Sequence, residues 1–156
     1  MRYGGFTPAD WAYLLSGDYH IFGGFANVAA VAAQNSEAQL QNPTGSGKQA
    51  FLRELWVSLA TAGDVVLTSF ATQLGTDDGA GVALHFGGGA AKSHVRHTTN
   101  AGIQGTQFGR FSLPAGQAVN VLKDWDVALD PNSGLLVAAV TVNVAMIASF
   151  VWSENN

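Results

Sequence analysis

Short segments rich in apolar and β-branched residues recur along this chain, and clusters of Gly, Pro, Asn and Asp separate them. Segments of this length with such boundaries are typical of β-strands. The predicted strands span residues 26–33, 37–41, 50–61, 65–74, 82–86, 92–99, 107–113, 118–122, 125–129 and 140–152. Alanine dominates the first of them, so helical propensity leaves a helix there as an alternative. We expect an all-β fold, an antiparallel β-sandwich that is jelly-roll-like, because that architecture best fits 156 residues.

The last predicted strand, residues 140–152, has the clearest alternation. Its even positions are all apolar, whereas its odd positions include Thr141, Asn143 and Ser149. A period of two with one apolar face is typical of a half-buried strand. The charge-free stretch 134–152 is also long enough for a membrane helix, but its polar and β-branched residues favour strands and no membrane contact.

The opposite face of this strand is also partly apolar, because Ala145, Ile147 and Val151 stand at odd positions. A second apolar face needs its own cover, either a neighbouring subunit or another part of the chain. We name Ile147, Val151 and Trp152 as candidate residues of a subunit interface.

Residues 1–24 differ from the rest of the chain because they combine aromatic residues with pairs of glycines. The sequence TPAD resembles a helix start with Pro at its first position, which predicts one or two helical turns over residues 8–15. We therefore divide the chain into an N-terminal arm, residues 1–24, and a sandwich domain, residues 25–156. The aromatic side chains need burial, either on the same sandwich or on a partner. The candidate partner-binding residues of the arm are Tyr3, Phe6, Trp11, Tyr13, Tyr19 and Phe22.

Charged residues make up only 12% of the chain, about half the usual fraction. The formal net charge is −4, and the seven Lys and Arg residues are scattered along the sequence. We therefore expect no binding of nucleic acid, whose phosphates need a basic patch. The absence of cysteine excludes disulfides and thiolate chemistry. A surface with so little charge suits a protein that packs against copies of itself or a large partner.

The segment 42–48, NPTGSGK, looks like part of a nucleotide-binding loop but lacks residues that such a loop needs. Asn42 stands where a Walker A loop has Gly, and Gln49 stands where it has Ser or Thr. Pro43 also removes a backbone amide from the turn. We predict a turn between two strands here, and no nucleotide.

The histidines include His94 and His97 in the segment HVRH, a spacing that places their rings on opposite faces of a strand. No carboxylate lies near them in sequence, so we predict no zinc site. The segment 75–81, GTDDGAG, contains Asp77 and Asp78 but lacks the ligand spacing of a calcium loop, and we predict a solvated turn. We therefore expect no metal and no cofactor.

Asp124, Asp126 and Asp130 surround Trp125, a combination that is able to present an acidic and aromatic surface to a sugar. Nothing in the chain resembles a catalytic triad, and the nucleophile elbow G-x-S-x-G is absent. We therefore expect no catalytic residue and no enzyme activity.

Two stretches resemble the small jelly-roll virion proteins of tailed bacteriophages. The first is QLQNPTGSGKQAFLRELWVS, residues 39–58. The second is LDPNSGLLVAAVTVNVAMIASFVWSEN, residues 129–155, in which a turn with Pro and Gly leads into a Leu-Leu-Val strand. The final strand of the second stretch ends on Trp-Ser-Glu.

This resemblance implies a non-enzymatic structural protein, usually a homotrimer, that serves as a capsid decoration or cement protein, a head fibre or a tail-tip component. It implies a place in the virion after assembly in the host cytoplasm, with the major capsid protein or another virion protein as partner. An aromatic arm is compatible with anchoring on a capsid. The alternative is a receptor- or carbohydrate-binding module of a head or tail fibre, with the Gly-rich loops 75–81 and 100–105 and Trp125 as its surface.

Overall fold

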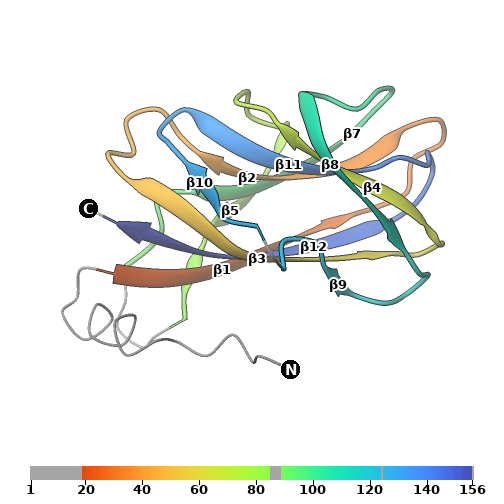
Figure 1. Ribbon diagram of the computed structural model, residues 1–156. Coiled ribbons are helices and arrows are strands. Elements are labelled where there is room, and N and C mark those ends of the chain that lie inside the picture. The colour runs from red at the N-terminus through yellow and green to blue at the C-terminus, as the bar shows by residue number, and fades with distance from the viewer. Residues whose placement is uncertain (1–18, 85–88, 124, 156) are drawn as a thin grey trace.

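The computed structural model describes residues 19–84, 89–123 and 125–155, which form two antiparallel β-sheets packed face to face (Figure 1). Sheet A has the order β10-β3-β12-β1-β6, with β9 also paired to β3, and sheet B has the order β5-β7-β2-β11-β4-β8. The strands of sheet A are β1 (Tyr19–Val28), β3 (Gln49–Leu59), β6 (Val82–Ala83), β9 (Val119–Asn120), β10 (Val127–Leu129) and β12 (Met146–Asn155). The strands of sheet B are β2 (Asn35–Asn42), β4 (Gly63–Ser69), β5 (Thr76–Ala80), β7 (His94–Asn100), β8 (Thr106–Leu113) and β11 (Ser133–Ala139). The expected all-β architecture of two antiparallel sheets is confirmed, and the described residues contain no helix.

The core lies between the two sheets and is built from alternate residues of their strands. In β12 the even-numbered residues from Met146 to Trp152 are buried, whereas Ile147 points outward. Leu67 and Leu135 face them from sheet B. The apolar face predicted from the alternation is therefore confirmed for the residues that belong to β12.

The strand predicted over residues 140–152 is shorter in the structure, because β11 ends at Ala139 and β12 begins at Met146. Residues 140–145 carry the chain from sheet B to sheet A, which no single straight strand can do. Asn143 has a positive φ of 59° in this turn, and its amide donates to the Gln34 carbonyl at 2.9 Å. The stretch considered as a membrane helix thus forms two strands. Within the described residues no helix has the length and apolar character needed to cross a membrane.

β1 pairs with β12 over its whole length, from Tyr19 opposite Asn155 to Val28 opposite Met146. The boundary expected at residue 24 therefore falls inside β1, and residues 19–24 belong to the sandwich. For the alanine-rich segment 26–33 the sequence leaves a helix as the alternative to a strand. Residues 26–28 of this segment belong to β1, and the rest of it is a turn rather than a helix.

Two loops cover the outer face of sheet B. Phe70 of the first loop and Ile103 of the second pack against apolar side chains of β4 and β11. Gln39 of β2 holds the first loop, because its side-chain amide donates to the Phe70 carbonyl at 2.7 Å. Glu37 of β2 holds the second loop by accepting a hydrogen bond from the Gln104 amide at 3.0 Å. β2 is consequently buried on both faces, and polar side chains with backbone partners fill its outer side.

The segment 75–81, expected to be a solvated turn, is mostly strand. Its residues form β5, which pairs with β7 at an edge of sheet B and contains a bulge between Asp77 and Gly79. Gly79 has φ of 109°, a conformation that glycine adopts without strain. The pairing with β7 creates the strand, and the local sequence, rich in Gly and Asp, gives no signal of it.

Candidate functional site

Large apolar side chains are exposed on the outer face of sheet A. Phe25 of β1 and Trp56 of β3 both lie opposite Ser149 of β12, and Ile147 is the neighbouring outward-facing residue of β12. Phe25, Trp56 and Ile147 are 64%, 41% and 46% exposed. Val151, which is half-buried, lies on the other side of Ser149 along the same strand. We call Phe25, Trp56, Ile147 and Val151 the sheet A face.

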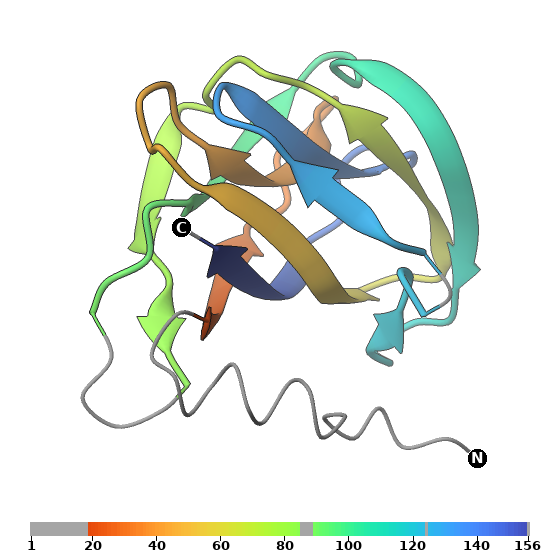
Figure 2. The same ribbon diagram turned by 60° about the vertical axis from the view of Figure 1, so that its left-hand side comes forward.

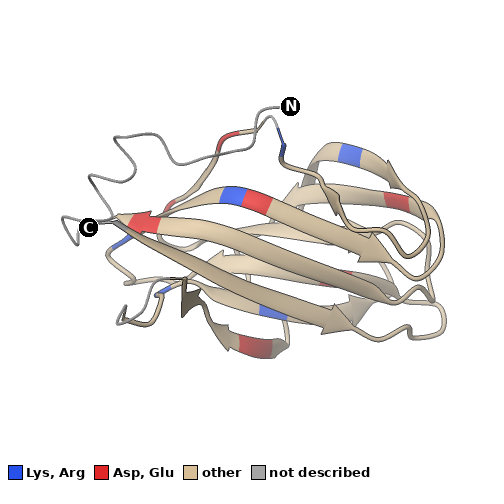
Figure 3. Ribbon diagram, turned by 90° about the horizontal axis from the view of Figure 1, so that it is seen from below, with Lys and Arg blue, Asp and Glu red and all other residues tan. Residues whose placement is uncertain are grey.

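The sheet A face carries little charge. Figure 3 views the long strands of this sheet from below, and their charged residues are Arg53 and Glu54 on β3 and Glu154 on β12. Glu154 is buried, and the carboxylate of Glu54 accepts a hydrogen bond from the Trp56 indole at 2.7 Å. An apolar surface with few charges loses little favourable hydration when a partner covers it, which is typical of the centre of a protein–protein contact.

The structure separates the three candidate interface residues. Ile147 and Val151 lie on the sheet A face, where a partner has access to them. Trp152 is fully buried, because the alternation of β12 turns it into the core, where its ring centre lies 6.0 Å from that of Phe22. Trp152 is therefore a core residue and not part of a surface contact.

The residues named in the arm divide in a similar way. Tyr19 is the first residue of β1, opposite Asn155. Phe22 is buried in the core, so it stabilises its own sandwich and is not accessible to a partner. The remaining arm residues, which lie outside the described residues, are Tyr3, Phe6, Trp11 and Tyr13.

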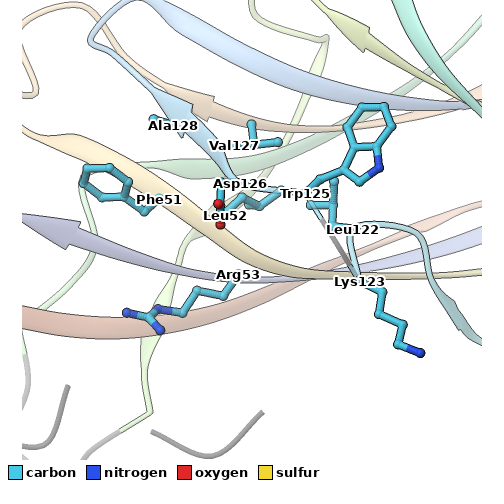
Figure 4. A pocket seen from close by; sticks show the side chains of 9 residues that line it. All are labelled: Phe51, Leu52, Arg53, Leu122, Lys123, Trp125, Asp126, Val127 and Ala128. Carbon is cyan, nitrogen blue, oxygen red and sulfur yellow. The ribbon is translucent and has the colours of Figure 1, made fainter. Parts of the chain in front are cut away.

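A groove of about 640 Å³ lies at the β3 edge of sheet A, between the points where β9 and β10 pair with β3. Phe51 and Arg53 of β3 line one side, and Lys123, Trp125 and Asp126 line the other. Figure 4 shows the Arg53 and Lys123 side chains extending to one side of β3 and the Trp125 indole to the other. The groove thus combines aromatic surface with charges of both signs.

Two aromatic neighbours hold Trp125 in place. The ring centre of Phe108 lies 5.5 Å from that of the indole, and the ring of Phe111 meets it edge-on at 6.0 Å. Gly109 lies beneath the indole, since a Cβ there would be 3.1 Å from it. Trp125 nevertheless remains partly exposed, so it is a rigid aromatic surface at the rim of the groove.

Of the acidic residues predicted around Trp125, the two that the structure describes, Asp126 and Asp130, lie at different sites. Asp126 lines the groove, whereas Asp130 lies in the turn before β11, and Asp124 lies outside the described residues. Arg53 also lines the groove, but it comes from β3, far away in the chain, and no pattern in the sequence links it to Trp125. The loop 75–81 is also separated from Trp125, since β5 and β8 are opposite edges of sheet B and Trp125 packs on β8, whereas the loop 100–105 leads directly into β8.

The acidic and histidine segments meet at the β5–β7 edge of sheet B. His94 Nδ1 lies 3.0 Å from both carboxylate oxygens of Asp77, and Arg96 donates to the same carboxylate at 2.9 Å. His97 Nδ1 lies 2.7 Å from Asp78. Each histidine therefore has its own carboxylate, and in the described part of the chain no group of three or more His, Asp or Glu is placed to hold a metal. These pairs join β5 to β7.

The segment 42–48 forms the turn between β2 and β3 that its sequence predicts. Gly45 and Gly47 have positive φ angles of 77° and 66°. Asn42 fixes the turn, because its side-chain amide donates to the Lys48 carbonyl at 2.7 Å and to the Leu129 carbonyl at 2.9 Å. The asparagine that replaces the first glycine of a nucleotide-binding loop thus has a structural function.

Comparison of the chain with protein-family models, curated proteins and solved structures finds no match. The sheet A face and the groove beside Trp125 are the two surfaces from which a function is inferred.

Proposed function

We propose that this chain is a structural protein of a tailed-bacteriophage virion, a capsid decoration or cement protein. In this proposal it forms a homotrimer and binds the major capsid protein or another virion protein, without enzyme activity. The observation that carries the proposal is the sheet A face, where Phe25, Trp56 and Ile147 are exposed on three adjacent strands. Apolar and aromatic residues at the centre of a contact supply most of its binding energy.

A jelly-roll topology is part of the proposal. The two ends of the chain pair with each other in β1 and β12, and the strands further in pair as β2 with β11, β12 with β3, and β11 with β4. Such nested pairing across two sheets supports a chain folded back on itself and wrapped into a sandwich. Strands β5 and β7 then extend the β2 side of sheet B. Jelly rolls are frequent in virion proteins, which adds weight to the assignment.

Self-association is tested first, by light scattering across a concentration series. We expect a mass of three times the 16.2 kDa protomer that persists on dilution. Ile147→Lys places a charge at the centre of the sheet A face and is expected to reduce the mass. Val31→Lys is the matched control, because Val31 is exposed to a similar degree in the β1–β2 turn. A wild-type protein that stays monomeric at every concentration contradicts the homotrimer.

Binding to a capsid is tested with full-length protein and purified capsids that lack it. Trp11→Asp tests the arm, and Ile147→Lys tests the sheet A face. A truncation should end at residue 18, because removal up to residue 24 deletes more than half of β1. Loss of capsid binding by Trp11→Asp in a protein that remains a trimer supports the arm as the anchor. Unchanged binding by that variant contradicts this role of the arm.

One observation favours a second function, the binding of a carbohydrate. Trp125 is rigid and partly exposed, and it lines the groove together with Asp126, an aromatic surface near a polar group that suits a sugar ring. A glycan array with the wild-type protein and with Trp125→Ala tests this function. Hits that the variant loses support it, and an array without hits for the correctly folded protein counts against it.

A further inference from the structure

The second half of β1 is a free strand edge. β6 pairs with β1 only at Phe22 and Gly23, so residues 24–28 have β12 as their single neighbour among the described strands. Figure 2 shows β6 beside the start of β1. A sheet edge without cover is a template to which another extended segment adds.

The backbone groups at this edge are turned outward. The Leu84 amide donates to the Ile21 carbonyl at 2.9 Å, which shows that odd-numbered residues of β1 direct their backbone groups towards β6. Phe25 and Asn27 continue this series after β6 ends. Their N–H and C=O groups therefore point away from β12, in the orientation that an added strand requires.

An apolar hollow of about 500 Å³ borders the free edge. Val82, Phe25 and Leu84 line it, and at 71%, 64% and 61% they are the most exposed large apolar side chains of the described residues. Gly24 allows the two sheets to approach each other there, because a Cβ on it would lie 2.7 Å from Val95. Single exposed apolar side chains are common, but three around one hollow indicate a binding surface. We call the free edge and the hollow together the β1 edge site.

We propose that the N-terminal segment of a neighbouring copy binds the β1 edge site, with residues 3–7, which precede Pro8, as an added strand. This proposal rests on the self-association proposed above and identifies one of its contacts. Residues 3–9 carry no charge and include Tyr3 and Phe6, which match the apolar hollow. The charged residue that lines the hollow, Asp78, is already paired with His97. Backbone hydrogen bonds hold such a strand, and the pockets for its side chains select the sequence.

A neighbouring copy is favoured over the same chain as the donor of this segment. Residues 1–18 join β1 at its N-terminal end, and β6 pairs with β1 near this end, at Phe22 and Gly23. β6 therefore stands between residue 18 and the free edge at residues 24–28. A segment that arrives from another copy does not have to pass β6. Eighteen extended residues span up to about 60 Å, which is enough to reach from one protomer of this size to the next.

The contact has two different halves, a segment and an edge, so it is heterologous. Heterologous contacts close into rings when the rotation between neighbours permits, and a trimer is such a ring. Each copy then donates one segment and accepts one. This arrangement also covers a sheet edge that would otherwise promote aggregation.

Two full-length variants that complement each other test the proposal. Leu84→Asp places a charge in the hollow and leaves the segment intact, whereas the double variant Tyr3→Asp and Phe6→Asp alters the segment and leaves the hollow intact. Val31→Asp and the double variant Val31→Asp and Val142→Asp are the matched controls, because both valines are exposed in turns outside the β1 edge site. Circular dichroism and thermal melting confirm first that all four variants fold as the wild type does. The dissociation constant for self-association is then measured for each variant alone and for a one-to-one mixture of the first two.

We expect each of the two variants to self-associate about tenfold or more weakly than the wild type, because an unpaired carboxylate is costly to bury. Their one-to-one mixture should form heterodimers, because the intact segment of Leu84→Asp fits the intact edge of the double variant. No closed ring should form, because the opposite contact has neither an intact segment nor an intact edge. Variants that associate as the wild type does overturn this proposal and leave the homotrimer standing. Variants that dissociate without recovery on mixing show that the segment acts within its own chain, which also overturns it. A wild-type protein that is monomeric contradicts the proposed homotrimer itself.

Discussion

The carboxylate of Glu154 accepts a hydrogen bond from the Ser93 amide at 2.7 Å and thereby joins the end of β12 to the start of β7. The Lys92 amide donates to the same carboxylate at 2.9 Å, and the Trp152 indole donates to it at 3.2 Å. Glu154 is buried, so its acceptor oxygens are satisfied by the protein rather than by water. The Trp-Ser-Glu sequence at the end of the chain is therefore a structural element that connects the two sheets.

Replacement of Glu154 tests this connection. Glu154→Gln exchanges one acceptor oxygen for an amide that points at backbone donors, so we expect a loss of about 1–3 kcal/mol in the free energy of unfolding. Urea denaturation of variant and wild type measures the loss. Asp126→Asn, at an exposed position, is the control and should stay close to the wild type. An unchanged midpoint for Glu154→Gln would show that the connection is not needed for stability.

Gly81 is expected to tolerate no side chain, because the ring of Trp152 occupies the space beside it. A Cβ on Gly81 would lie 2.2 Å from Trp152 Cζ2 and 3.0 Å from the Cβ of Phe22. Gly81→Ala should therefore destabilise the protein by about 1–3 kcal/mol or more, since a packed core resists an added methyl group. Gly102→Ala is the control, because nothing lies within 4 Å of its Cβ position. Equal melting temperatures for the two variants would contradict the close packing at Trp152.

The pairing of Asp77 with His94 and Arg96 is expected to fasten β5 to the sheet. Partial burial acts to raise the pKa of Asp77, but the hydrogen bonds from His94 and the Gly79 amide, with the charges of His94 and Arg96, outweigh it and lower the pKa. Because the pKa of Asp77 is lower in the folded protein than its ordinary value, the ionised carboxylate stabilises the fold at pH values above the ordinary carboxyl pKa. This stabilisation is lost as the pH falls through the lowered pKa. Asp77→Asn should cost at most about 1 kcal/mol at neutral pH, because the pair is partly exposed.

Hydrogen exchange of the β5 amides is the sensitive measurement for this pair. We expect faster exchange in β5 for Asp77→Asn at neutral pH, and a difference that shrinks when the pH falls below the pKa of Asp77. Exchange in β11, at the centre of sheet B, is the internal control and should not change. Equal exchange in β5 at every pH would show that backbone pairing alone holds this strand.

The alternation in the sequence predicts the inward face of β12, including Phe150, because burial on one side of a strand imposes a period of two. It does not predict which strands are neighbours. Glu154 and Ser93 are far apart in the sequence, and so are Phe25 and Trp56, and the pairing of strands alone brings each pair together. The sheet A face is therefore visible in the sequence only at Ile147 and Val151, which share one strand.

The polar residues of β2 are a second case that the pattern does not predict. Glu37, Gln39 and Gln41 alternate with apolar residues, which usually indicates one solvated face. The loops over sheet B supply backbone partners for these side chains, so all three are buried. A sequence shows where polar side chains stand but not that a distant loop will cover them.

Glu37 provides the last prediction, a dependence of stability on pH. Burial raises the pKa of its carboxyl group above the ordinary value of 4.5, although hydrogen bonds from the Gln104 amide and the Asn100 side chain act to lower it. A raised pKa in the folded state means that folding favours the protonated form. The contribution of Glu37 to stability is therefore fully present when the pH is below the ordinary pKa of a glutamate carboxyl group. It is lost as the pH rises through the raised pKa of the folded state. Glu37→Gln is neutral at every pH, so the difference in unfolding free energy between this variant and the wild type should shift in favour of the variant as the pH rises above 4.5. Glu54→Gln, which changes a less buried carboxyl group on β3, is the control. A difference between Glu37→Gln and the wild type that is constant over this range would contradict the burial of an ionisable group at this position.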